Sequence, residues 1–116
     1  MANLEFLEAG ENVINTWTIN YRPPNGGFYN GKLYVTNRRV IYDARFDISV
    51  KGLAEMYAIS VGTYKYVAIP KDQIQNIEEK SSFFKKQVIL TVANGEKHIF
   101  DYGMLSVKKV IEAIKQ

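Results

Sequence analysis

The clearest alternation of hydrophobic and polar residues runs over residues 31–46. Apolar and polar positions alternate along residues 32–36 and again along residues 39–46, and a period of two is typical of half-buried strands. Residues 36–38 lie where the chain must reverse its direction, and Asn37 tolerates the positive φ angle that such turns need. The pattern predicts a β-hairpin, which belongs to a structural scaffold rather than to a catalytic centre.

Five further segments have the pattern of short strands. They are residues 13–21, 64–69, 74–80, 87–93 and 97–102. Between the last two lies Asn94-Gly95, the strongest short signal for a hairpin, because both central residues of that turn need positive φ. Two prolines and two glycines in residues 22–27 predict a loop after the first strand.

The period of the pattern changes after Gly103. Aliphatic residues now follow the spacing of one helical face, and they are Val107, Val110, Ile111 and Ile114. Lysines and a glutamate cover the other face, so we expect an amphipathic helix from about residue 104 to the end. A seven-stranded sheet that curls has open ends and an apolar interior, and such a helix can cover one end. We therefore expect a mainly β fold, a seven-stranded antiparallel curled sheet or barrel capped by one C-terminal α-helix.

Length and composition fit a single globular domain over residues 1–116, with 47% hydrophobic residues and no cysteine. The first 13 residues are acidic and lack a long apolar run, so we expect no signal peptide. No segment reaches the roughly 20 apolar residues that a spanning helix needs. We expect a cytoplasmic protein, with peripheral attachment to a membrane as a further option. Residues 80–116 hold seven Lys against three acidic residues, a mild basic bias.

The sequence offers no convincing catalytic set. His98 is the only histidine, and it stands alone in a predicted strand. With one histidine and no cysteine, a transition-metal site would need a carboxylate cluster that the sequence does not show. Basic residues also do not alternate with aromatic ones along a strand, which argues against nucleic-acid binding. We therefore expect no enzyme activity, cofactor, metal or nucleic-acid partner.

Two segments are candidates for binding. The first combines two aromatic residues with three lysines, namely Lys80, Phe83, Phe84, Lys85 and Lys86. Rings in the headgroup layer and ammonium groups on anionic lipid would hold such a segment at a membrane. Alternatively, the two rings close a mouth of the barrel while the lysines keep a loop soluble, and we prefer this second interpretation.

The second segment, residues 47–62, is too apolar for a solvated connection. Leu53, Met56 and Tyr57 lie in its middle, where a short helix is possible. The segment either folds back onto its own sheet or presents a patch to a partner or a second copy, since large exposed apolar patches usually signal association. We prefer the first of these alternatives.

The order of elements resembles the pleckstrin-homology superfold, and more narrowly its GRAM-type branch. The resemblance rests on a glycine, a small apolar strand, Thr-Asn-Arg-Arg, an aliphatic residue and an aromatic. Here these are Gly31, Leu33, Val35, Thr36, Asn37, Arg38, Arg39, Val40 and Tyr42. Gly10-Glu11, Ile69-Pro70 and Gly95 with Phe100 resemble further parts of the family pattern, so the similarity covers about residues 7–115.

The resemblance implies a non-catalytic module that binds lipid headgroups, membranes or proteins. In the lipid-binding members, basic residues of the first two strands and their loop hold phosphates, and Arg22 and Lys32 occupy comparable positions. The Lys/Arg-x-Arg cluster usual on the second strand is missing, because Leu33 and Tyr34 follow Lys32. Arg38 and Arg39 at the hairpin turn are further anion candidates, although we prefer to interpret them as solvated turn residues.

We therefore expect a binding module that associates weakly with anionic membrane lipid or with a protein partner. The alternative is a homo-oligomeric interaction protein that uses residues 47–62 and has no lipid ligand.

Overall fold

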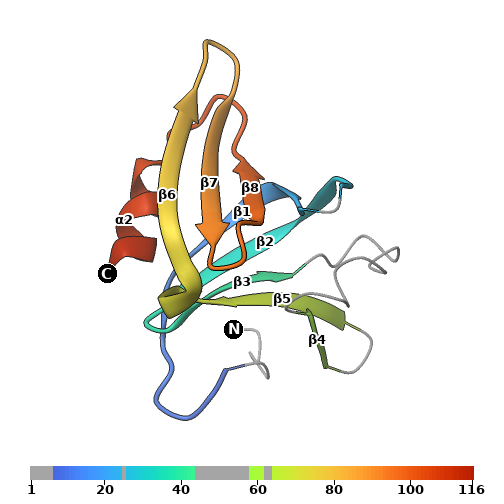
Figure 1. The fold of residues 1–116 in the computed structure, drawn as a ribbon, viewed down its shortest axis with the longest axis vertical. Coiled ribbons are helices and arrows are strands. Elements are labelled where there is room, and N and C mark those ends of the chain that lie inside the picture. Colours follow the sequence, from blue (N-terminus) through green and yellow to red (C-terminus); the bar gives the residue numbers. More distant parts are fainter. Residues whose placement is uncertain (1–6, 25, 44–57, 62–63) are drawn as a thin grey trace.

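The computed structural model describes residues 7–24, 26–43, 58–61 and 64–116. One antiparallel sheet dominates it (Figure 1). Its strands are β1 (Val13–Arg22), β2 (Tyr29–Thr36), β3 (Arg39–Asp43), β4 (Ala58–Val61), β5 (Tyr64–Pro70), β6 (Ile74–Ser81), β7 (Lys86–Val92) and β8 (Lys97–Asp101). A short 3-10 helix, η1 (Lys71–Gln73), joins β5 to β6, and an α-helix, α2 (Lys108–Lys115), ends the chain.

The strands follow the order β4-β5-β3-β2-β1-β8-β7-β6, and every neighbouring pair is antiparallel. The sheet bends sharply across β1 and β8, so that β6 and β7 stand steeply against β3 and β5 (Figure 1). In the described residues the outer strands β4 and β6 do not pair, so the sheet is curled but not closed into a barrel.

The predicted mainly β, antiparallel fold with a C-terminal helix is confirmed. All seven expected strands are present, and β4 adds a short strand at the edge beside β5. β4 is the described part of the apolar segment 47–62. The predicted short helix in that segment lies mainly outside the described residues, as do Leu53, Met56 and Tyr57.

The main core lies inside the curl of the sheet and is closed by α2. Side chains of six strands lining the curl, such as Leu33 and Phe100, pack with the helix residues Val110 and Ile114. The helix contacts β1 and β2, and it begins four residues later than expected because residues 103–107 form a turn and a cap. The amphipathic pattern therefore places the helix where the sheet leaves its apolar side open.

Lys71 in η1 fastens the end of this helix. Its Nζ donates hydrogen bonds to the carbonyl oxygens of Ala113 and Gln116, at 3.0 Å and 3.2 Å. The last carbonyls of a helix lack partners within the helix, so a cation at this position satisfies them and complements the helix dipole. Burial lowers the pKa of Lys71.

Two turns are built differently from the prediction. Within the described residues positive φ angles occur at glycines alone, so neither Asn37 nor Asn94 adopts the left-handed region. The β7–β8 connection is a turn closed by the hydrogen bond from Gly95 N to Val92 O, and Gly95 then takes φ +87°. This is the three-residue hairpin loop, in which only the residue after the turn needs positive φ.

Gly95 gives a prediction about stability. Replacing Gly95 with alanine is expected to destabilise the domain by about 1–2 kcal/mol, the cost of holding an L-residue in the left-handed region. No other atom lies within 4 Å of the position that the new Cβ would take, so backbone strain alone accounts for the cost. Urea unfolding followed by Trp17 fluorescence measures it. Gly95→Asn is the control, because asparagine tolerates this region, and equal losses in the two variants would contradict the explanation.

Candidate functional site

The turn between β6 and β7 projects from one end of the molecule, at the top of Figure 1. Pairing of the two strands runs up to Ser81 opposite Lys86, and residues 82–85 make the turn. Ser82 N donates to the carbonyl oxygen of Lys85 at 2.8 Å, and Lys86 Nζ donates to Ser81 Oγ at 2.8 Å. These bonds hold the turn in one compact shape. We call residues 80–86 the hairpin tip.

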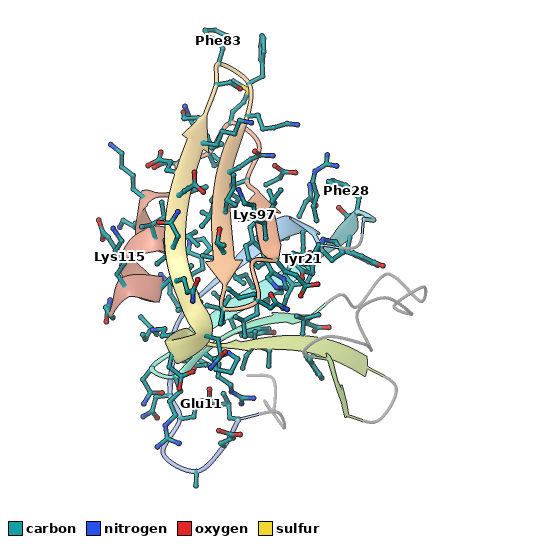
Figure 2. All side chains as sticks on the ribbon, viewed as in Figure 1. Glu11, Tyr21, Phe28, Phe83, Lys97 and Lys115 are labelled. Carbon is teal, nitrogen blue, oxygen red and sulfur yellow. The ribbon has the colours of Figure 1, made fainter. Side chains whose placement is uncertain are left out.

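Two phenylalanines lie in the turn of the hairpin tip, and Figure 2 shows Phe83 at the outermost point of the molecule. Phe83 is 80% exposed and Phe84 is 70% exposed. Their rings contact each other edge to face, with centroids 4.6 Å apart and planes at 74°. The preferred interpretation, in which these rings close a barrel mouth, is therefore wrong, because both point into solvent beyond the sheet.

Three lysines surround these rings. Lys80 and Lys85 are exposed, and Lys86 is half-buried. In the part of the chain that the structure describes, none of the three forms an ion pair. Their charges are therefore available to an anionic surface that meets the hairpin tip.

The candidates on the first two strands are not gathered into a comparable site. Arg22 Nε donates to Asp101 Oδ2 at 2.8 Å, and its guanidinium lies 4.6 Å from the ring centroid of Phe28. Lys32 lies opposite Thr18 on β1, about 13 Å along the strand from Arg22. Asp101 thus already neutralises the charge of Arg22, and Lys32 lies too far along the sheet to form one site with Arg22.

Arg39 is buried and acts as a structural residue. Its Nε donates to Glu11 Oε2 at 2.8 Å, and its second guanidinium nitrogen donates to Glu11 Oε1 at 2.5 Å. Thr36 Oγ1 donates to the same carboxylate at 2.6 Å and accepts from the backbone N–H groups of Arg38 and Arg39. Arg39 therefore holds the carboxylate of Glu11, and its interpretation as a solvated turn residue is wrong because its side chain is buried.

Asn37 completes this arrangement. Its Oδ1 accepts from Asn12 N at 2.8 Å, and its Nδ2 donates to the carbonyl oxygen of Gly10 at 3.2 Å. The Thr-Asn-Arg-Arg sequence therefore joins the β2–β3 turn to the segment before β1. Of the two arginines in this Thr-Asn-Arg-Arg sequence, Arg38 is the exposed one. It lies beside a shallow hollow that Lys71 and Asp72 also line.

The environment of Glu11 keeps it ionised. Burial alone would raise its pKa, but hydrogen bonds from Arg39, Thr36 and the backbone N–H of Glu8, with the guanidinium charge, lower the pKa to about 2. Glu11 thus carries a full charge at neutral pH, and Arg39 is the counter-charge that compensates its burial.

His98 lies in the core rather than in a cleft. Its side chain is fully buried, and its Nδ1 shares a hydrogen bond of 2.6 Å with the Tyr21 hydroxyl. Burial lowers the pKa of His98 to about 4 and raises that of Tyr21. At neutral pH the pair is therefore uncharged, and it is a packing element of the sheet.

Sequence reasoning missed one exposed apolar pair. Met104 and Leu105 are 66% and 60% exposed in the connection between β8 and α2. Their exposure could have been predicted from two features of the sequence. Both residues follow Gly103, and both precede Val107, where the aliphatic spacing of the helix begins. Phe28, 45% exposed, lies in the β1–β2 connection, away from the hairpin tip (Figure 2).

Comparison with known proteins agrees with this fold. The chain is similar to a domain of known structure, described as the C-terminal domain of an unknown protein from Leishmania infantum. The TM-score is 0.67 with 12% sequence identity, over 93% of this chain and 85% of that one. No curated protein matches the chain. The family model of the GRAM domain matches residues 2–115. The chain therefore belongs to the GRAM domain family, whose members are lipid- and protein-binding modules.

Proposed function

We propose that the protein is a non-enzymatic module that attaches peripherally to anionic membranes through the hairpin tip. The observation that carries the proposal is the exposure of Phe83 and Phe84 in a hydrogen-bonded turn that projects from the molecule, with three lysines in the same segment. Membership of a family of binding modules supports it in general terms. No helix in the described ranges is long and apolar enough to cross a bilayer.

The size of the expected interaction fits reversible attachment. Removing a phenylalanine side chain from water contributes about 1.5–3 kcal/mol when burial is complete. Each lysine near an anionic surface adds on the order of 1 kcal/mol, and this part weakens with salt. Two rings and three lysines thus give weak binding to vesicles that falls as ionic strength rises.

The hairpin tip favours a bilayer over a protein groove. Its two rings contact each other at the end of a projection, so they can enter a soft layer together without a matching pocket. Exposed phenylalanine together with lysine is a combination found at membrane interfaces. A protein partner would bind regardless of lipid charge, so the dependence of binding on anionic lipid distinguishes a bilayer from a protein.

Vesicle co-sedimentation tests the proposal. The double variant Phe83→Ser/Phe84→Ser is expected to bind vesicles of phosphatidylcholine and phosphatidylserine about 10- to 100-fold more weakly than the unaltered protein, because two apolar contacts are lost. Phe28→Ser is the matched control, since it removes an exposed phenylalanine away from the hairpin tip. Equal binding by both variants would contradict the proposal.

The charge dependence is tested in the same assay. Lys85→Gln/Lys86→Gln should lower binding to phosphatidylserine vesicles, whereas Lys97→Gln/Lys115→Gln removes the same charge away from the tip and should lower it less (Figure 2). Equal binding to vesicles with and without phosphatidylserine at low salt would eliminate anionic membranes as the partner.

A further inference from the structure

The connection between β8 and α2 carries the second exposed apolar pair of the described residues. Met104 and Leu105 lie in a turn that the hydrogen bond from Leu105 N to Tyr102 O closes at 3.1 Å, with Gly103 at φ +60°. The backbone thus presents the two side chains outward. They do not contribute to the core, in which the next buried residue along the chain is Val107. We call residues 103–105 the second turn.

The second turn is fastened to the base of the hairpin tip. Lys86 N donates to the carbonyl oxygen of Gly103 at 2.7 Å, and Tyr102 N donates to the carbonyl oxygen of Lys86 at 2.9 Å. In Figure 1 the connection between β8 and α2 accordingly lies toward the same end of the molecule as the β6–β7 turn. Two exposed apolar pairs are therefore held at one end by backbone hydrogen bonds.

The surface beside the second turn has the composition of a membrane interface. Leu105 lines a hollow of ≈ 530 Å³ together with Trp17, Tyr102, Lys108 and Lys109. Trp and Tyr, whose rings combine apolar faces with a polar group, are enriched where a bilayer meets water. The two lysines are exposed and open α2.

Glu112 also lines this hollow, one helical turn further along α2. Lysines therefore outnumber acidic residues there two to one. The hollow, like the hairpin tip, therefore has a net positive charge that complements an anionic surface. The two regions adjoin through the hydrogen bond between Lys86 and Gly103.

We infer that the second turn is a second point of contact with the anionic bilayer, so that the domain binds with two separate apolar pairs. This inference rests on the proposed function of the hairpin tip. One inserted turn leaves the domain free to tilt about it, whereas two turns joined by backbone hydrogen bonds restrict that tilt. The bilayer would thereby hold the domain in one orientation, with the β2–β3 turn and Glu11 directed away from the lipid (Figure 2).

Single labelled cysteines test the inference, because the chain contains no cysteine of its own. Phe84→Cys, Leu105→Cys and Lys115→Cys would each carry an environment-sensitive nitrobenzoxadiazole label. With vesicles containing phosphatidylserine, we expect a blue shift and an intensity increase at positions 84 and 105, and none at 115. A response at 84 without one at 105 overturns the second contact and leaves the proposed function standing. No response at either position contradicts the proposed function itself.

A substitution gives an independent measure. Met104→Ser/Leu105→Ser is expected to lower the vesicle partition coefficient roughly tenfold, with an unchanged melting temperature because neither side chain is in the core. Binding equal to that of Phe28→Ser, in a preparation where Phe83→Ser/Phe84→Ser binds weakly, would overturn the inference.

Discussion

Replacing Arg39 with methionine is expected to destabilise the domain by about 3–5 kcal/mol, the usual cost of breaking a buried ion pair by removing one partner. The variant would leave the carboxylate of Glu11, whose side chain is fully buried, without its counter-charge. Thr36 and the Glu8 N–H would still donate to that carboxylate, but neither supplies a positive charge. Since a domain of this size is stable by only about 5–15 kcal/mol, a large share of the folding free energy would be lost.

Urea unfolding at pH 7.5, followed by Trp17 fluorescence, measures this loss. Arg38→Met is the matched control, because it removes the neighbouring arginine at an exposed position and should change stability by less than about 0.5 kcal/mol. Glu11→Leu/Arg39→Met removes both charges and should be more stable than Arg39→Met alone. A loss below about 1 kcal/mol in Arg39→Met would show that the pair is not a main source of stability.

The same variant separates the scaffold from the proposed binding surface. Glu11 lies at the end of the molecule opposite Phe83 (Figure 2), so Arg39→Met should leave vesicle binding of the folded protein unchanged. Arg39 therefore serves the fold, although a basic pair in a hairpin turn could equally have held a phosphate. Sequence reasoning could not separate these roles, because the partner of Arg39 lies 28 residues away.

Alternation along the chain predicted the strands well but not how deeply they are buried. All five residues of β3 are buried, although the pattern indicates a half-buried strand. Val40 and Tyr42 face the main core, whereas Ile41 joins a second cluster on the outer side of the sheet. Leu7 and Val13 from the start of the chain pack against that second cluster. A period of two locates the two faces of a strand, and it contains no information about a distant segment that covers the outer one.

Irregular pairing explains where strict alternation assigns a residue to the wrong face of the sheet. The register of β1 against β2 shifts between Val13 and Asn15. Trp17 therefore shares the main core with Ile14, while Val13 packs against the outer cluster, although strict alternation groups Val13 with Trp17. An extra residue in one strand moves the following side chains to the other face.

A second shift, in β6, explains that strand's weak pattern. It falls between Ile74 and Asn76. Ile74 and Ile77 consequently both pack against the main core despite their spacing of three. Neither shift has a proline or glycine to mark it in the sequence.

At the hairpin tip, composition suggests burial but the structure shows exposure. Phe83 and Phe84 have the composition of buried residues, and their exposure depends on where β6 and β7 end relative to β8. Pairing of β7 with β8 stops at Gln87 opposite Asp101, so the turn beyond Lys86 stands clear of the third strand. Composition drew attention to this segment, but the lengths of three strands decide that its rings meet solvent.

Acidification from pH 6.5 to pH 4 is expected to remove about 3 kcal/mol of stability through His98 alone. In the folded protein its pKa is about 4, because burial disfavours the charged ring, against an ordinary value of 6.5. Between these two values the unfolded chain binds a proton that the folded chain does not, so the free energy of unfolding falls as the pH decreases. Glu11 affects stability at lower pH, since its pKa of about 2 lies below the ordinary value of 4.5. Its contribution to the free energy of unfolding is lost between pH 4.5 and pH 2.

Urea unfolding at a series of pH values from 7.5 to 4.5 separates the two groups. His98→Gln keeps a polar side chain opposite the Tyr21 hydroxyl but cannot titrate, so its stability should change less with pH across this range than that of the unaltered protein. Arg38→Met should keep the full dependence on pH there, because it leaves both His98 and the ion pair of Glu11 with Arg39 in place. Parallel curves for His98→Gln and the unaltered protein would assign the loss to other groups. They would also mean that the buried histidine takes up its proton without unfolding the sheet around Tyr21.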